Sequence, residues 1–523
     1  GGGGGAMSAP KYVLAIDEGT TSTRAILFDK NGVPKHSSQQ EFTQIYPQPG
    51  WTEHDPAEIY SKVEATVADV MRAAGASASD VAAIGITNQR ETTVAWDLQT
   101  GRPLHNALVW LDLRTAEIAA RLEAEGGKDR FRAKTGLPVS TYFSAVKMVW
   151  LMENVPAVAD AAAEGRCLFG TIDSWILYNM TGGVDSGGVH NHLTDITNAS
   201  RTMLMDLKTL NWDKGICEEL GIPVHCLPQI RSNSEELGRV KSGPLAGVPI
   251  TATIGDQHAA LLGQGCTEVG EVKNTYGTGC FMVVNTGAQP MPSSHGLLTT
   301  MSWKLGPDSP PVYALEGAVA VAGRGVQWLR DQLKIIDAAP EVGDLAASVP
   351  DSGGVTFVPG FSGLLAPWWR SDARGALVGM TLQTSRGHIA RAMLEGVAFQ
   401  TVDVMRAMEQ DIGHPIKAVK TDGGLTQCDL MMQIQADVMG SPVLRAKMPE
   451  ATALGAAFAA GLHVGFYSGA EEIHEILKWH GGYTQFKPVT AAAEREAAVR
   501  RWHDAISRSL MDSAPPPLAA PGA

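Results

Sequence analysis

The fold of this chain is decided by the octapeptide Asp17-Glu18-Gly19-Thr20-Thr21-Ser22-Thr23-Arg24. One short apolar run, 12–16, precedes this polar turn, and a second, 25–28, follows it. Apolar runs of this length that are bounded by turn residues are typical of buried strands. Asn31-Gly32 then predicts a tight hairpin turn into a third strand near residues 35–42. We therefore expect three antiparallel strands at the start of the chain, with a Gly- and Thr-rich first turn.

The rest of the chain alternates between helix and strand patterns, which indicates mixed α/β layers. Asp55-Pro56-Ala57-Glu58 predicts a helix start, because it combines a capping Asp, a Pro at the first helical position and a Glu at the third. Further elements are expected at the following ranges: helix 56–74, strand 81–87, strand 249–254, helix 389–409 and a closely packed helix over the small residues 451–461.

A second Gly/Thr turn, Tyr276-Gly277-Thr278-Gly279, lies between two apolar runs and suggests two halves of related design. A chain of 523 residues is also too long for one hydrophobic core. We therefore expect an α/β fold of two domains, 11–262 and 263–508, with a catalytic cleft between them. Residues 1–10 are expected to be a linker remnant and an N-terminal tail, and residues 509–523 a disordered tail.

The bulk composition narrows the range of functions. A net charge of −13 leaves no basic stripe for phosphates, so no nucleic-acid partner is expected. No apolar run is long enough to span a membrane and no signal-peptide pattern precedes Lys11, so we expect no integral membrane segment. The six cysteines are scattered without a CxxC pair, which favours buried thiols in a reducing compartment and therefore the cytoplasm.

The first Gly/Thr turn has the chemistry of a phosphate site, although the P-loop, the dinucleotide G-x-G-x-x-G and the protein-kinase motifs are all missing. A turn of Gly and small hydroxyl residues exposes successive backbone N–H groups, which form a concave nest for phosphate oxygens. The hydroxyls of Thr20, Thr21 and Ser22 can add donors, and Arg24 can add a positive charge. Asp17 is placed to hold Mg²⁺ through water. An ordinary polar hairpin is the alternative for this turn taken alone.

Two later turns argue against that alternative. Gly255-Asp256-Gln257 follows the strand 249–254, and a carboxylate between a strand end and a helix start can accept a proton from an attacking hydroxyl. Asp422-Gly423-Gly424 follows another strand, and its glycines allow close approach of the backbone to a base or ribose. Together with the two Gly/Thr turns, these segments predict a phosphotransferase that uses Mg-ATP.

In these turns the chain resembles the superfamily of sugar kinases, actin and heat-shock ATPases. Within it, the chain is similar to the FGGY carbohydrate kinases, and in particular to those that phosphorylate glycerol. The supporting stretches, spread from residue 11 to about 505, are 16–22, 85–93, 142–144 with Lys147 and Trp150, 198–204, 255–257, 273–281, 316–318 and 327–330. The resemblance implies two ribonuclease H-like (actin-like ATPase) domains and transfer of phosphate from ATP to glycerol, giving glycerol 3-phosphate.

The acceptor site can also be argued from chemistry. Glycerol offers three hydroxyls and a carbon edge, so a selective site needs fixed polar partners and an apolar wall. Arg90 donates a fork of N–H groups and Glu91 accepts, so the adjacent pair can grip neighbouring hydroxyls. A surface ion pair is the alternative for such a pair. The resemblance implies this set of substrate-binding residues: Arg90, Glu91, Asp256 and Gln257 at the hydroxyls, and Trp110, Tyr142 and Phe281 around the carbons.

The resemblance also assigns roles around the nucleotide. Asp256 is the expected general base, and Asp17 and Asp256 are the expected Mg²⁺ residues. ATP is expected at Gly323, Gln327 and Gly424, with Thr278 in the second phosphate turn. Many relatives have an Asn that can contact adenine where this chain has Cys428. This difference leaves the adenine contact open.

Two further expectations depend on the resemblance. The stretch Lys241-Ser242-Gly243-Pro244-Leu245-Ala246-Gly247 lacks the arginine with which some relatives bind fructose 1,6-bisphosphate, so inhibition by this compound is expected to be weak or absent. A homodimer or homotetramer is expected. The competing interpretations are another FGGY kinase that acts on a pentulose, gluconate or a longer polyol, and a nucleotide-driven binding or chaperone protein.

Overall fold

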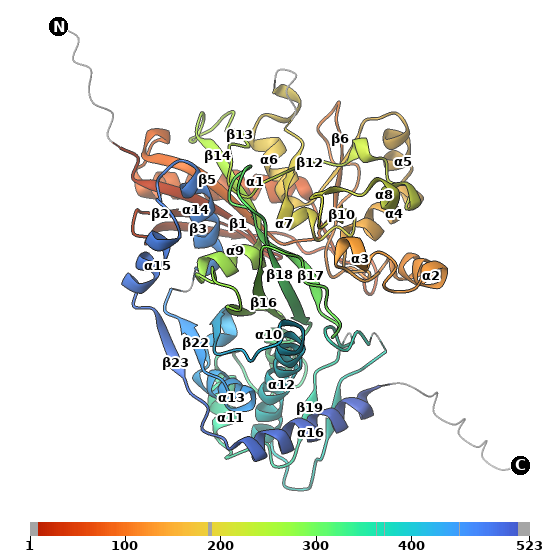
Figure 1. Ribbon diagram of the computed structural model, residues 1–523, viewed down its shortest axis with the longest axis vertical. Coiled ribbons are helices and arrows are strands. Elements are labelled where there is room, and N and C mark those ends of the chain that lie inside the picture. Colours follow the sequence, from red (N-terminus) through yellow and green to blue (C-terminus); the bar gives the residue numbers. More distant parts are fainter. Residues whose placement is uncertain (1–8, 187–190, 362, 371, 449, 511–523) are drawn as a thin grey trace, which may run out of the picture.

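The computed structural model describes residues 9–186, 191–361, 363–370, 372–448 and 450–510 (Figure 1). Most of the expected linker remnant and the tail from residue 511 lie outside this range. Two large mixed β-sheets, one in each half of the sequence, organise the described chain.

The first sheet has the strand order β13-β14-β5-β1-β2-β3. Its strands are β1 (Tyr12–Glu18), β2 (Ser22–Phe28), β3 (Pro34–Glu41), β5 (Val81–Asn88), β13 (Gly238–Arg239) and β14 (Pro249–Gly255). β1, β2 and β3 are antiparallel, as the octapeptide and the Asn-Gly turn predicted. β5 is parallel to β1, and β14 is parallel to β5. The alternating side chains of β1 enter two different hydrophobic cores, so both faces of this sheet are covered.

The second sheet repeats this arrangement in the order β17-β18-β16-β15-β21-β22-β23. Its strands are β15 (Val272–Tyr276), β16 (Cys280–Gly287), β17 (Leu298–Trp303), β18 (Val312–Val319), β21 (Val419–Asp422), β22 (Val443–Ala446) and β23 (Tyr483–Phe486). β15, β16 and β18 are antiparallel neighbours, whereas β21 and β22 continue the sheet parallel to β15. The predicted α/β fold with two halves of related design is therefore confirmed.

Helices cover the two sheets. α1 (Pro56–Ala74) has the predicted bounds, and its first turn is capped by the Asp55 carboxylate, which accepts from the backbone N–H of Ala57. α12 (Arg386–Ile412) extends beyond the predicted 389–409 at both ends. The other helices of eight or more residues are α2 (Ala116–Gly126), α4 (Ser144–Asn154), α5 (Pro156–Ala163), α6 (Ile172–Met180), α9 (Asp256–Gly263), α10 (Gly323–Asp331), α13 (Asp429–Met439), α14 (Ala451–His463), α15 (Ala470–Trp479) and α16 (Ala492–Ser509).

One helix of the second half packs on the sheet of the first. α14, drawn in blue among the red strands in Figure 1, contacts α9, β5, β1 and β14. The contact is between backbones: a Cβ on Gly455 would lie 1.9 Å from the carbonyl oxygen of Ala259, and one on Gly85 would lie 2.3 Å from that of Ala456. The small residues of 451–461 therefore allow the close packing that their composition predicted.

No helix in the described part of the chain is long and apolar enough to cross a membrane.

Candidate active site

Three parallel strands of the first sheet end at one edge and carry the first group of polar residues. In the register of β1, β5 and β14, Asp17 lies beside Thr87, and Thr87 beside Ile254. The chain leaves β5 towards Arg90 and leaves β14 towards Asp256, the first residue of α9. The carboxyl ends of parallel strands in α/β sheets are where ligands bind.

The largest group of predicted residues meets in one small cavity of about 150 Å³, which we call the polyol pocket. Its lining residues are Thr20, Arg90, Glu91, Trp110, Tyr142, Asp256, Gln257, Thr275, Gly277, Thr278 and Phe281. All seven predicted substrate residues are among them. The pocket lies between the two halves of the chain, because Thr275 and its neighbours come from the β15–β16 hairpin of the second sheet.

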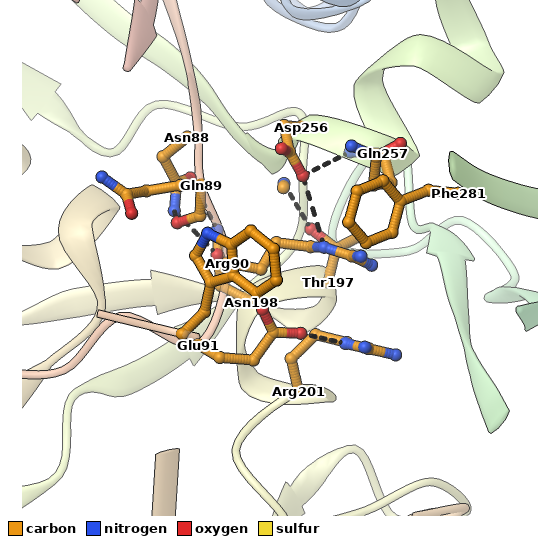
Figure 2. A network of polar contacts seen from close by, with 12 residues as sticks. Asn88, Gln89, Arg90, Glu91, Thr197, Asn198, Arg201, Asp256, Gln257 and Phe281 are labelled. Atoms are coloured by element: carbon orange, nitrogen blue, oxygen red, sulfur yellow. Dashed lines mark hydrogen bonds and ion pairs between the residues drawn. The ribbon is translucent and has the colours of Figure 1, made fainter. Parts of the chain in front are cut away.

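Arg90 and Glu91 belong to a buried ion-pair network that joins the two halves. Figure 2 shows Arg90 beside Asp256, and Glu91 paired with Arg201. The Arg90 guanidinium donates twice to Glu316, with Nη1–Oε2 and Nη2–Oε1 distances of 2.6 and 2.7 Å. Glu91 Oε1 accepts from Arg201 Nε at 2.5 Å, and Arg201 Nη2 lies 3.3 Å from Glu316 Oε1. Glu316 therefore takes two N–H groups of the Arg90 fork, and each of the two residues pairs with a partner far away in sequence, while both still line the polyol pocket. That the two residues bind neighbouring hydroxyls stays a prediction.

The network has two positive and two negative side chains, and each is at most 2% exposed. The two arginines hold the pKa of Glu316 well below its usual value, against the effect of burial. Burial raises the pKa of Glu91 although Arg201 and Arg90 oppose the shift. Glu91 also has a φ of 61°, which is uncommon for a residue other than Gly and fixes the direction of its side chain.

Asp256 occupies the end of α9 that faces the pocket. Its Oδ1 accepts from the backbone N–H of Gln257 at 2.7 Å and lies 3.3 Å from Arg90 Nε. Burial raises the pKa of Asp256, while the positive charges of Arg90 and Lys273 lower it. Because its pKa is raised, this carboxylate is a better proton acceptor than an exposed Asp.

Gln257 is oriented by a buried lysine. Lys273 Nζ donates to Gln257 Oε1, to Thr275 Oγ1 at 2.9 Å and to the carbonyl oxygen of Phe281 at 3.2 Å. Burial lowers the pKa of Lys273 to about 8. The Gln257 carbonyl is occupied in this way, and its side-chain amide hydrogen-bonds to the Asp256 carboxylate, which lowers the pKa of Asp256.

Three aromatic side chains form the apolar wall. The Trp110 ring centroid lies 5.7 Å from that of Tyr142 and 6.0 Å from that of Phe281. The Trp110 indole Nε1 donates to Thr20 Oγ1 at 3.0 Å, which ties this wall to the first Gly/Thr turn. The wall therefore lies directly beside the predicted phosphate turn.

The structure separates the residues that were predicted for that turn. Thr20 lines the polyol pocket, whereas Thr21 is exposed and Ser22 Oγ accepts from Gln39 Nε2 at 2.9 Å. Arg24 Nη2 lies 3.0 Å from Asp17 Oδ2 and 2.7 Å from Glu450 Oε2, and it lines a cavity that adjoins the Asp422-Gly423-Gly424 turn. Arg24 thus pairs with a residue from the second half of the sequence, at the start of the helix that packs on the first sheet.

A cavity of about 360 Å³, the nucleotide cavity, gathers the predicted ATP residues Thr278, Gly323, Gln327, Gly424 and Cys428. Glycine allows two backbone segments to pack closely in the wall of this cavity. A Cβ on Gly423, whose φ is 95°, would lie 2.4 Å from the carbonyl oxygen of Tyr276. The sequence reasoning missed part of its wall, namely Tyr276, Gly277, Val326, Ala339, Pro340, Val342, Leu425 and Gln427. The apolar residues among these form a hydrophobic wall, which is typical of a site that binds a nucleobase.

The donor set at the cleft edge suits Mg²⁺ rather than a softer metal. No cluster of three or more His, Cys, Asp or Glu side chains that could hold a metal occurs among the described residues. Asp17 and Asp256 provide carboxylate oxygens, and burial raises the pKa of both, so a nearby cation would relieve their charge. Mg²⁺ is usually held by one or two carboxylates together with waters and substrate phosphates.

The sequence reasoning also missed the roles of Arg201 and Glu316. Both residues lie in stretches that support the family resemblance, but neither has a local pattern that indicates an ion pair. The Arg90–Glu316 contact joins residues 226 positions apart. Only the folded arrangement of both halves brings them together.

The chain is similar to known proteins over most of its length. Residues 12–263 match the N-terminal domain model of the FGGY family of carbohydrate kinases, and residues 272–464 match its C-terminal domain model. The chain is 52% identical over 500 residues to a glycerol kinase of Rhizorhabdus wittichii, covering 96% of this chain and 97% of that protein. It is also 52% identical to a glycerol kinase of Beutenbergia cavernae, with 95% and 98% covered. A crystal structure of Plasmodium falciparum glycerol kinase with ADP superposes with a TM-score of 0.87 at 37% identity, covering 97% of this chain and 99% of that one.

Proposed function

Because the chain belongs to the FGGY family of carbohydrate kinases, we propose that it transfers the γ-phosphoryl group of ATP to a terminal hydroxyl of glycerol, with Asp256 as the general base. The activity is that of an ATP-dependent glycerol kinase. The observation that carries the proposal is the polyol pocket, in which a partly buried carboxylate, a charged network and three aromatic rings enclose about 150 Å³. A volume of this size suits a three-carbon polyol.

The pocket accounts for how glycerol would be held. Glu91 and Gln257 line the pocket with polar side chains, while Arg90 presents Nε beside Asp256. Trp110 and Phe281 cover the carbon edge. Fixed donors and acceptors of this kind position a hydroxyl for attack and replace water around it.

The chemical step follows from this placement. A terminal hydroxyl oxygen forms a bond to the γ-phosphorus while the bond between that phosphorus and the leaving oxygen of ADP breaks. Asp256 accepts the proton that the hydroxyl releases. The N–H groups of the two Gly/Thr turns would stabilise the phosphate oxygens. Arg24 would also contact the phosphate oxygens, which would compete with Glu450 for its guanidinium.

Asp17 and Asp256 would hold Mg²⁺, which when bound neutralises charge on the phosphates. ATP would lie across the nucleotide cavity, with its base in the apolar slot and its phosphates beside Thr278. The adenine contact at Cys428 and the assembly into a homodimer or homotetramer stay predictions. We place the reaction in the cytoplasm, where ATP is supplied.

One assay tests the proposal against its alternatives. ADP release should depend on glycerol and should be much slower with erythritol or xylulose. Release that is faster with a ketose or a longer polyol would favour another FGGY kinase activity, and release stimulated by peptides but not by glycerol would favour a chaperone-like protein.

A variant tests the role of the base. Asp256→Asn keeps the shape of the side chain and should lower turnover by about 10²–10⁴-fold, the usual contribution of a general base, with glycerol binding nearly intact. Near-normal turnover in this variant would contradict the role of Asp256 while leaving the activity itself in place.

A further inference from the structure

A second, larger cavity opens beside the polyol pocket. This cavity, which we call the vestibule, has a volume of about 640 Å³. One wall comes from residues 46–52 and 140–142 with Trp110, Leu111 and Leu113, and the other from Thr278, Ala320, Arg324 and Leu365. Trp110, Tyr142 and Thr278 line both the vestibule and the polyol pocket, so the two spaces meet at these side chains.

The first wall of the vestibule is held rigidly. The Arg114 guanidinium lies 3.9 Å from the ring centroid of Trp51 and 4.8 Å from that of Trp150. Arg114 Nη1 also lies 2.8 Å from Glu53 Oε1, and the Asp112 carboxylate accepts from the backbone N–H of Thr52 at 2.6 Å. Because the loop is fixed by buried charges, the vestibule is formed before any ligand arrives.

Arg324 is the one charged residue among the described residues that line the vestibule. It is exposed, and its guanidinium has no hydrogen-bond or ion-pair partner within the described chain. It lies in the first turn of α10, where the helix dipole is positive and a cation is unfavourable. An unpaired cation at this end of a helix, facing an otherwise uncharged cavity, is suited to an anionic ligand.

The position of Arg324 indicates which anion it would bind. Its backbone N–H donates to the carbonyl oxygen of Thr278 at 3.1 Å, and Thr278 lines the polyol pocket, the nucleotide cavity and the vestibule alike. Gly323, the residue before it, lines the nucleotide cavity, but Arg324 does not. Arg324 therefore lies in the wall of the vestibule, on the acceptor side of Thr278, and not in the wall of the nucleotide cavity.

We propose that the vestibule binds the phosphate group of a polyol monophosphate whose polyol end stays in the polyol pocket, with Arg324 as the phosphate ligand. This inference rests on the proposed function, since that reaction forms such a compound beside Thr278. Arg324 draws the new phosphate away from the nucleotide cavity, so that ADP and the product occupy separate spaces. Glycerol phosphate then leaves through the vestibule.

The test compares dissociation constants of glycerol phosphate, measured by titration calorimetry, for the full-length wild type and Arg324→Gln. One charge-assisted hydrogen bond is lost, so we expect binding to weaken by at least about tenfold. Inhibition of the forward reaction by glycerol phosphate should be competitive with glycerol and not with ATP, and it should weaken equally in the variant. Arg330→Gln is the matched control, because Arg330 lies on the same helix but pairs with Asp331 at 2.6 Å.

Three results would overturn the inference. Glycerol phosphate could bind Arg324→Gln as tightly as wild type. The KM for ATP could rise in this variant as much as the product constant does, which would assign the cation to the nucleotide. Inorganic phosphate could bind wild type as tightly as glycerol phosphate does, which would mean that the polyol end makes no contact. Glycerol-dependent ADP release by the wild type tests the proposed function separately, so the two can fail independently.

Discussion

Replacing Glu316 by Gln tests whether the buried ion-pair network both stabilises the fold and positions the acceptor. Glu316 is fully buried and holds Arg90 by two hydrogen bonds of 2.6 and 2.7 Å, with Arg201 at 3.3 Å. The substitution keeps the shape of the side chain but removes one of the two negative charges that balance Arg90 and Arg201. It also replaces one of the two oxygens that accept from Arg90 by an NH₂ group, which would face an Arg90 N–H, itself a donor.

The expected cost follows from this geometry. Removing one partner from a buried ion pair typically costs about 3–5 kcal/mol, because the remaining charge is left uncompensated. We expect the free energy of unfolding of Glu316→Gln to fall by about this amount. Arg90 loses its anchor beside Asp256, so the KM for glycerol should rise at least about tenfold, the effect of one lost charged hydrogen bond. The KM for ATP should change much less, since Glu316 does not line the nucleotide cavity.

Urea unfolding and initial-rate kinetics measure the two effects. Glu496→Gln is the control, because Glu496 pairs with Arg406 at the surface and such exposed pairs contribute at most about 1 kcal/mol. The reasoning is refuted if Glu316→Gln unfolds within about 0.5 kcal/mol of the wild type, the range of an ordinary surface substitution, and keeps its KM for glycerol.

Three further predictions concern pH, packing and regulation. The pKa of Lys273 is lowered from 10.5 to about 8, so the ammonium that orients Gln257 loses its proton as pH rises through 8; the KM for glycerol should then rise in wild type, and Lys273→Met should lack this pH dependence. In the unfolded chain Lys273 keeps its proton up to about pH 10.5, so between pH 8 and 10.5 the unfolded state binds one more proton than the folded state. The free energy of unfolding should therefore rise with pH in this interval, which urea titrations at pH 7 to 10 would check. Gly455→Ala should destabilise the fold by about 1–3 kcal/mol through overpacking, whereas Gly215→Ala, where an added methyl meets only the Asp213 carboxylate, should not; equal melting temperatures would contradict this. Fructose 1,6-bisphosphate should inhibit weakly or not at all, and a clear inhibition curve in the millimolar range would disprove the interpretation of the 241–247 loop.

Local signals in the sequence predicted the elements that depend on neighbouring residues. The helix start at Asp55-Pro56 and the hairpin turn at Asn31-Gly32 need only a few adjacent side chains, and both are present in the structure. The residues predicted to bind the polyol each follow directly after a strand end or lie in a motif that resembles a known family. The structure places all seven of them around one pocket.

Contacts between distant segments could not be predicted in this way. Arg90 was expected to offer its N–H fork to a ligand, and Glu316 from the other half of the chain takes two N–H groups of that fork. Arg24 was expected at the phosphates, yet it now pairs with Glu450. In each case the partner depends on how the two sheets face each other, which no local pattern encodes. The unpaired state of Arg324 is equally invisible in the sequence.

The contact between α9 and α14 has a consequence for motion. At their crossing, Gly263 and Gly455 bring the two backbones together, and added methyl groups there would lie 1.8 and 1.9 Å from carbonyl oxygens. Surfaces made of backbone and methyl groups carry no long side chains that must be withdrawn before they can turn against each other. The crossing can therefore serve as a smooth pivot. Rotation about it would change the width of the cleft while the hydrogen bonds within both sheets stay in place.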